Sequence, residues 1–325
     1  MLLNLLQQFD IALADFLSIL FALGLGLFFV LAALCLPVAV LFGECVYLGT
    51  RKAFQDKCAM QTAQAAFASG LVSYLAIGLC VTALLSSLRP ELFAPLLFTR
   101  TAAGFFLPFI PLCAMALYAL SWSALKKTRV LHLFLGLTAS VCCLALLFFG
   151  ILILGNVQQP LLFDLLWDTP QPVLLGLVED FLTIPHQWFM LAFLLLTGLA
   201  SGFSLAQVWL FMRRAKADYG RDYYNFALRY CARGAVGFCL AATALGGFIF
   251  YRLYLLTPHE FRQPADVGIL VVAYGLPLVC CMLWAFMAKS DTPLRHKGGA
   301  FFSCIFLLIA LCAQLAALIS TFPLV

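Results

Sequence analysis

The segment NVQQPLLFDLLWDTPQPVLLGLVEDFLTIPHQWFM, residues 156–190, is the longest interruption in an otherwise strongly apolar sequence. It contains the acids Asp164, Asp168, Glu179 and Asp180, and it has no Lys or Arg. Four apolar runs precede it and four follow it. The segment therefore divides the chain into two halves, and we expect it to contribute to any functional site.

The composition indicates a membrane protein, because 65% of the 325 residues are hydrophobic and only 10% are charged. About 20 apolar residues cross one bilayer core. Backbone polar groups must be satisfied within lipid, so each run is expected to be a helix, and the short alternating segments of a membrane barrel are not seen. We predict an all-α polytopic protein with eight transmembrane helices at residues 12–48, 60–88, 101–125, 129–155, 186–212, 226–255, 266–288 and 299–322.

The basic residues indicate the topology. Fifteen of the 19 Lys and Arg residues fall in four connections, at residues 51–57, 126–129, 213–233 and 289–297. Basic connections stay cytoplasmic, so both termini and the 156–190 segment are predicted to face outward, on the periplasmic side of a bacterial-type inner membrane. The net charge of +5 is explained by this topology, and no nucleic-acid partner is expected.

The cysteines do not predict a disulfide framework or a covalent cofactor. All 13 lie in apolar runs or in cytoplasmic connections, where Cys behaves as a small apolar residue. No CxxCH motif occurs, which excludes covalent haem c on this chain. Signatures for zinc, phosphate binding and a nucleophilic triad are also missing from the sequence, so no metal site is predicted.

The two halves resemble a weak internal repeat. Glu44 lies seven residues before Arg51, and Gln207 lies seven residues before Arg214. Each pair ends a long run and precedes a basic connection and a helix rich in small residues. We therefore predict a four-helix unit at 1–155, an outward connecting segment at 156–185 and a second four-helix unit at 186–325.

Glu44 is an unusual residue for its position, because it lies at the end of the first apolar run. Carboxylates within a membrane are costly, and they often mark proton paths. We predict Glu44 as a proton-path residue; the alternative is a carboxylate anchored at the membrane interface.

Residues 30–160 resemble the first four helices of cytochrome bd quinol oxidase subunit I. A long helix ends in Glu44 and is followed by Val46-Tyr47, Gly49 and a basic loop. Next come the helix FASGLVSYLAIGL and a third helix ending at Trp122. His132 then opens a fourth helix, which closes in NVQQP, and the fifth run ends in a similar Trp209-Leu-Phe-Met-Arg213.

The departures from that family concern its haem ligands. Residues 12–48 contain no His where the family has a ligand, and 101–125 contain no acid. The family's fifth-helix ligand would fall near Met190. Phe261-Arg262-Gln263-Pro264 is similar to the family's Gly-Arg-Gln-Pro-Trp signature but lacks its glycine and tryptophan. The resemblance therefore implies the scaffold without the oxygen chemistry.

A quinone site needs an apolar slot and a few polar groups at the membrane surface. The outward-facing candidates are Glu179, Asp180, His186, Trp188, Arg252, Tyr254, His259 and Arg262. Glu179 and Asp180 could instead form a solvated pair that caps an amphipathic surface helix.

A b-type haem is a second cofactor to consider, and it usually needs two axial ligands at a similar membrane depth. His186 with His259 or Met190 would meet this requirement. The alternative is that both histidines are interface residues bonded to water, loop backbone or head groups.

Together, these features favour a quinone-interacting integral subunit of a respiratory or electron-transfer complex, similar to cytochrome bd subunit I but without its haem ligands. The expected partners are other membrane subunits and an outward-facing electron carrier such as a cytochrome. A self-contained oxidase is not expected. The alternatives are a small-solute transporter and a purely structural membrane anchor.

Overall fold

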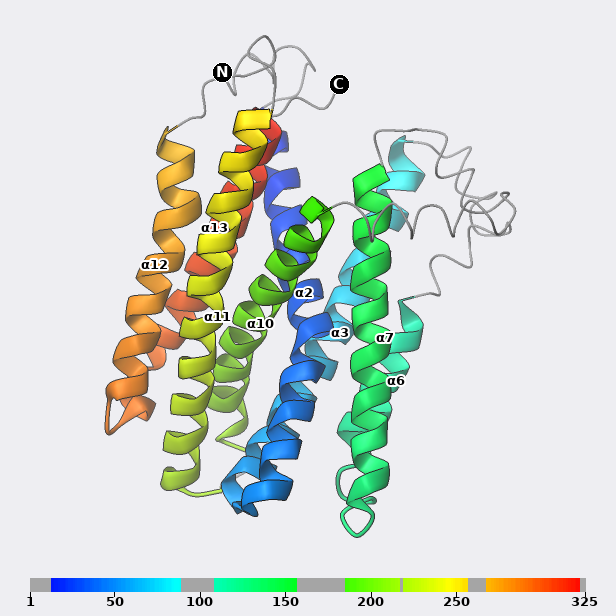
Figure 1. The fold of residues 1–325 in the computed structure, drawn as a ribbon, viewed down its shortest axis with the longest axis vertical. Helices are drawn as coiled ribbons and strands as arrows, with labels where there is room; N and C mark the ends of the chain where they lie inside the picture. Colours follow the sequence, from blue (N-terminus) through cyan, green and yellow to red (C-terminus); the bar gives the residue numbers. More distant parts are fainter. Residues whose placement is uncertain (1–12, 89–107, 157–184, 217–218, 257–266, 322–325) are drawn as a thin grey trace, which may run out of the picture. The chain divides into compact units, whose positions relative to one another are not determined.

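The computed structural model describes residues 13–88, 108–156, 185–216, 219–256 and 267–321. These residues are helical throughout most of their length, and no strand occurs among them. The α-helices are α2 (Leu13–Thr50), α3 (Ala53–Leu88), α6 (Phe109–Leu120), α7 (Arg129–Asn156), α10 (Pro185–Arg213), α11 (Arg221–Leu256), α12 (Val267–Lys289) and α13 (Lys297–Thr321) (Figure 1). The predicted all-helical class is confirmed.

Each helix falls on one of the predicted apolar runs. Six of them, α2, α7, α10, α11, α12 and α13, are long and apolar enough within the described residues to cross a membrane. Helix α6 has only 12 residues, fewer than the ~20 that a bilayer core requires. The chain is thus a multi-pass helical membrane protein, whereas eight spans and outward-facing termini stay predictions.

The chain forms two compact units. Unit 1 consists of Met1–Ala32 and Phe193–Val325, and unit 2 consists of Ala33–Ala192. Helices α2 and α10 each contribute residues to both units. The boundaries predicted from sequence at residues 155 and 186 stay predictions.

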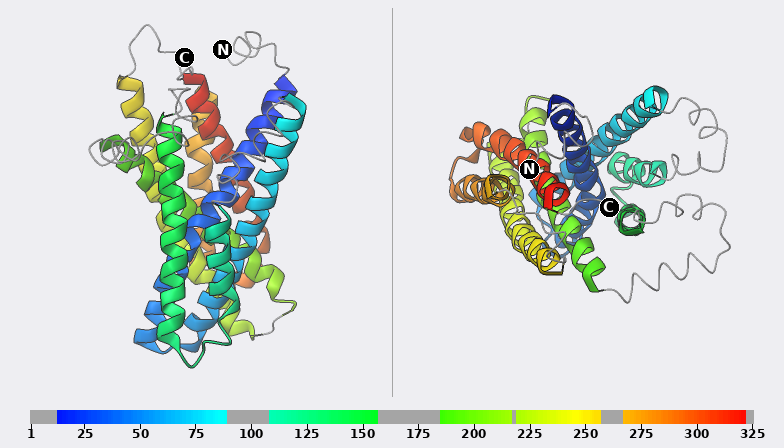
Figure 2. Two further views of the ribbon diagram at one scale, coloured as in Figure 1. Left: turned by 90° about the vertical axis from the view of Figure 1, so that its right-hand side faces the viewer. Right: turned by 90° about the horizontal axis from the view of Figure 1, so that it is seen from above.

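In unit 2, tight connections bring helix ends together. Helix α2 ends at Thr50, and Arg51 adopts a left-handed backbone conformation with φ of 57° while its N–H donates to the Tyr47 carbonyl at 2.7 Å. This geometry lets α3 start at Ala53. Residues 121–128 join α6 to α7, which lie side by side (Figure 2).

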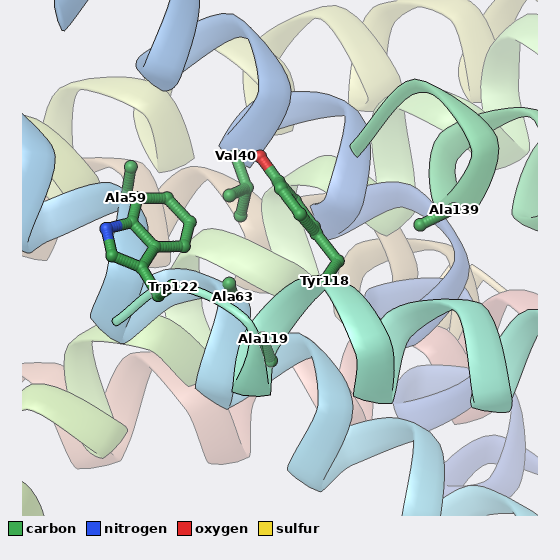
Figure 3. Close-up of a cluster of buried hydrophobic side chains, with 7 residues drawn as sticks. All are labelled: Val40, Ala59, Ala63, Tyr118, Ala119, Trp122 and Ala139. Atoms are coloured by element: carbon green, nitrogen blue, oxygen red, sulfur yellow. The ribbon is translucent and has the colours of Figure 1, made fainter. Parts of the chain in front are cut away.

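Close helix packing in unit 2 depends on glycine. A Cβ at Gly70 of α3 would lie 2.7 Å from the Met115 methyl group of α6, and a Cβ at Gly136 of α7 would lie 2.7 Å from Tyr118. Small residues at such points let membrane helices approach closely. A core of buried residues fills the space between the helices, with the Tyr118 and Trp122 rings packed against alanines and a valine: Val40, Ala59, Ala63, Ala119 and Ala139 (Figure 3).

In unit 1, α12 packs against both α11 and α13, and the first part of α2 contributes Gly24, which packs directly against the Cys312 thiol. Helix α12 contains Pro277, which has no N–H to donate to the carbonyl of Ala273. The side-chain amide of Gln314 on α13 donates to that carbonyl at 3.1 Å. A side chain from a neighbouring helix thus satisfies the carbonyl that the proline leaves free.

Replacing Gln314 with leucine is expected to lower the free energy of unfolding by about 1–3 kcal/mol, because the fully buried Ala273 carbonyl loses its donor. The measurement is denaturant unfolding in detergent. In a Pro277→Ala background the backbone N–H of residue 277 can replace the lost donor. Gln314→Leu should therefore lower the free energy of unfolding by less in that background. Equal costs in both backgrounds would contradict this explanation.

Candidate functional site

Six side chains with polar groups meet where the helices of unit 2 end, and we refer to them as the Glu44 cluster. They come from α2, α3, α6, the connection after α6, and α7, and they are Glu44, Asp56, Tyr118, Trp122, Arg129 and His132. The turn at Arg51 and the 121–128 connection bring these residues to the same end of the unit.

Glu44 is the centre of the cluster and is fully buried. The Tyr118 hydroxyl donates to Glu44 Oε2 at 2.8 Å, and His132 Nδ1 lies 2.7 Å from Glu44 Oε1. Both carboxylate oxygens therefore have close partners. Such pairing is what allows a carboxylate to lie inside a protein away from water.

The contacts of His132 indicate how many protons the pair holds. His132 Nδ1 faces the Glu44 carboxylate, and Nε2 lies 3.2 Å from the backbone carbonyl of Tyr118. A carbonyl oxygen only accepts hydrogen bonds, so Nε2 must carry a proton. A second proton then lies between Nδ1 and Oε1, either on the imidazole or on the carboxyl group. In both arrangements, Glu44 and His132 together have no net charge.

Arg129 connects Glu44 with a second acid. One guanidinium nitrogen, Nη2, lies 2.9 Å from Asp56 Oδ2, and the other, Nη1, lies 3.7 Å from Glu44 Oε1. The indole N–H of Trp122 donates to the other oxygen of Asp56 at 3.2 Å. The guanidinium also lies over the rings of Tyr47 and Trp122, at 5.4 and 5.7 Å, where cation–π attraction adds to the ion pairs.

The charges of the cluster balance. Asp56 and Arg129 neutralise each other, and Glu44 and His132 together are neutral when they hold the shared proton. Each charged group of the cluster thus has a partner close by, and removal of one partner would leave an unpaired charge among buried groups, which is costly.

His132 is also held by aromatic rings. Its ring centre lies 4.4 Å from that of Trp122 in an edge-on arrangement and 4.8 Å from that of Tyr118. Next to the cluster, Lys126, Lys127 and Thr128 in the α6–α7 connection are exposed. The buried Glu44 cluster thus lies close to a polar surface, on the side predicted to be cytoplasmic.

The outward candidates are only partly described. Glu179, Asp180, His259 and Arg262 lie outside the described residues. The first turns of α10 contain His186, Trp188 and Met190, with Trp188 exposed, and the end of α11 contains Arg252 and Tyr254, with Arg252 exposed. As quinone or haem ligands, these residues stay predictions.

Sequence reasoning predicted Glu44 but not its partners. The basic connection explained Arg129, and His132 was interpreted only as the start of a helix. A signal was available: Arg129 and His132 are one turn apart at the start of α7, on the same predicted side as Glu44. The described residues contain no group of three or more His, Cys, Asp or Glu side chains that could hold a metal ion.

The fold and the Glu44 cluster define a multi-pass helical membrane protein with a buried ionic network. Comparison with known protein families and with curated proteins gives no match.

Replacing Gly136 with alanine is expected to lower the free energy of unfolding by about 1–3 kcal/mol, through overpacking. The new Cβ would lie 2.7–2.9 Å from two ring carbons and the hydroxyl oxygen of Tyr118, and the hydrogen bond to Glu44 restrains this side chain. Thermal unfolding in detergent measures the effect. The matched control is Gly150→Ala on the same helix, where nothing lies within 4 Å, so the better helix former should stabilise slightly. Similar effects of both changes would contradict the packing argument.

Proposed function

We propose that this chain is an integral membrane subunit of an electron-transfer complex, that it interacts with quinone, and that the Glu44–His132 pair exchanges protons used in the quinone reaction. The observation that supports this proposal is the pair itself, a fully buried carboxylate and imidazole with Nδ1 and Oε1 2.7 Å apart. A purely structural anchor has no need for such a pair, which is costly to bury.

The chemistry of quinones requires both electrons and protons. Reduction of a quinone to a quinol takes up two electrons and two protons, and oxidation releases them. The resemblance to cytochrome bd subunit I suggests that the electrons pass through partner subunits, with an outward-facing cytochrome or similar carrier supplying the haems or clusters. In this proposal the quinone lies near His186 and Trp188 at the outward face of an inner membrane.

The Glu44 cluster serves this reaction from the opposite, cytoplasmic end. Glu44 and His132 accept or release the shared proton, because either group can hold it across the short Oε1···Nδ1 contact. Tyr118 donates to Glu44 and keeps the carboxylate oriented, while Arg129 and Asp56 link the pair to the exposed α6–α7 connection. The proposed role of the cluster is thus uptake or release of protons at the membrane surface.

The decisive experiment purifies the chain with its natural partners, extracts the lipids and measures quinone-dependent turnover. Bound quinone should be found, and Glu44→Gln should reduce turnover about a hundredfold, the lower end of the effect of a general acid–base group. Quinone content and assembly should stay unchanged. The matched control is Asp291→Asn, which changes a fully exposed carboxylate and should leave turnover unaffected.

A proton-coupled small-solute transporter is the second candidate, and the buried polar side chains Thr197, Ser201 and Gln207 in unit 1 favour it. In a transporter the extracted lipids would contain no stoichiometric quinone, and Glu44→Gln would abolish solute uptake driven by a pH gradient. A complex that retains full function with Glu44→Gln would exclude a proton role for the pair under both candidates.

A further inference from the structure

Helix α10 carries a row of buried polar side chains in unit 1. Thr197, Ser201, Ser204 and Gln207 are at most 5% exposed. Thr197 Oγ1, Ser201 Oγ and both amide atoms of Gln207 have no hydrogen-bond partner among the described residues. Buried polar atoms are normally paired, and leaving several unpaired in one helix would be costly.

Other helical hydroxyl groups in this protein behave differently. Thr62, Ser140 and Thr243 each donate to the backbone carbonyl four residues earlier at 2.8 Å. This local bond is the usual solution for Ser and Thr within a helix. Thr197 and Ser201 do not make it, so their hydroxyl groups are available to another partner.

The four positions lie on one face of α10, because they are spaced by four, three and three residues. From Thr197 to Gln207 the row covers about 15 Å at 1.5 Å per residue, roughly half the thickness of a bilayer core. The row also faces other helices of unit 1, since Ser204 neighbours the Cys304 thiol of α13.

A small cavity lies at the Thr197 end of the row. Its volume is about 10 Å³, and its lining is mostly apolar but includes the side chains of Thr197, Cys239, Thr243 and Gln314. A cavity of this size accommodates roughly one water molecule when polar groups surround it. The cavity therefore offers space for about one water molecule beside the unpaired Thr197 hydroxyl group.

We propose that the polar row on α10 binds a chain of ordered water molecules inside unit 1, and that these waters give protons access to the interior of the unit. The atoms of the row are neutral and spread along a line, whereas a cation site needs several oxygens that converge on one point. An apolar ligand would leave the hydroxyl and amide groups unpaired. The proposal is independent of any quinone, because it concerns a different unit and different residues.

The test uses buried thiols as probes of proton access. The purified protein is transferred into D₂O, and infrared spectroscopy of the S–H stretch measures how fast each thiol exchanges its proton for deuterium. Cys239 lines the cavity and is 1% exposed, while Cys35 and Cys143 in unit 2 are fully buried and do not line it. Single Cys→Ser variants assign each band. Cys239 should exchange to S–D at least several-fold faster than Cys35 and Cys143.

The combined change Thr197→Val and Ser201→Ala should slow exchange at Cys239 to the rate of the two control thiols, with a melting temperature equal to or below that of the wild type. Slow exchange at Cys239 in the wild-type protein would overturn the proposal. So would unchanged exchange in the variant, or a clear rise in its melting temperature, because removing dry, unpaired hydroxyl groups stabilises a protein.

Discussion

Replacing Glu44 with alanine is expected to lower the free energy of unfolding by about 3–5 kcal/mol, the usual cost of removing one partner from a buried ion pair. Tyr118 would lose its acceptor, and His132 would lose the carboxylate at Nδ1. Arg129 would lose the nearby Glu44 carboxylate and keep Asp56 as its ion-pair partner. Denaturant unfolding of the purified chain in detergent, followed by Trp fluorescence, measures the loss.

Glu44→Gln is the matched control, and it should lower the free energy of unfolding much less than Glu44→Ala. Its carbonyl oxygen can accept from the Tyr118 hydroxyl, and its amide can donate to Nδ1 of a neutral His132 that keeps its proton on Nε2. The charges of the cluster then still balance, since Asp56 and Arg129 remain paired. If alanine and glutamine destabilised the protein equally, the proposed hydrogen-bond pattern would be wrong.

Replacing Arg129 with methionine is expected to cost about 3 kcal/mol, near the lower end of the same range because Arg129 and Asp56 are not completely buried. Methionine can retain the apolar contact with Trp122 and Tyr47. The decrease in unfolding free energy therefore measures mainly the loss of the positive charge. Without the guanidinium, Asp56 keeps the hydrogen bond from the Trp122 indole but has lost its cation, so the cluster gains a net negative charge. The measurement is the same unfolding experiment.

Two variants distinguish charge from packing at this position. Arg129→Lys keeps the charge but loses the planar guanidinium that reaches two carboxylates. Its free energy of unfolding should therefore lie between those of the wild type and Arg129→Met. In a double-mutant cycle, Asp56→Asn should add little to Arg129→Met, because both changes break the same pair. Fully additive effects would show that Arg129 and Asp56 act separately.

The helices could be predicted from sequence because hydropathy is a local property. Every described α-helix falls on a predicted apolar run, and the long first run, for example, is α2. The exception in length is α6, for which the run at 101–125 predicted more than the 12 residues described. Residues 89–107 lie outside the described part of the chain, so the start of that run is not tested.

The Glu44 cluster could be predicted only in part. A carboxylate at the end of an apolar helix is conspicuous in a sequence, and Glu44 was predicted for that reason. Its partners are not, because Tyr118 and His132 lie 74 and 88 residues further along the chain. Only the packing of α2, α6 and α7 identifies which polar residues at that end of the unit meet.

The outward-facing quinone and haem candidates were predicted on weaker grounds than Glu44. Histidines and acids near 156–190 were predicted from residue type and predicted sidedness, without any contact to support them. The described part of that region supplies only the first turns of α10, with Trp188 exposed. Glu44 is buried with two hydrogen-bonding partners, while its proton-path role stays a prediction, as do the roles of the quinone candidates.

The division of α2 between the two units has a consequence for biosynthesis. The first part of the helix, up to Ala32, belongs to the unit that is completed by Phe193–Val325, and Gly24 packs on Cys312. At about 5–20 residues per second, a ribosome needs roughly ten to thirty seconds to make the intervening segment. Unit 2 can assemble during that time, while the N-terminal half of α2 is in the membrane before the rest of unit 1, including α13, has been made. During that interval the face of α2 that contains Gly24 lacks its partner helix. This order of assembly therefore creates a risk that nascent chains associate with one another through that face.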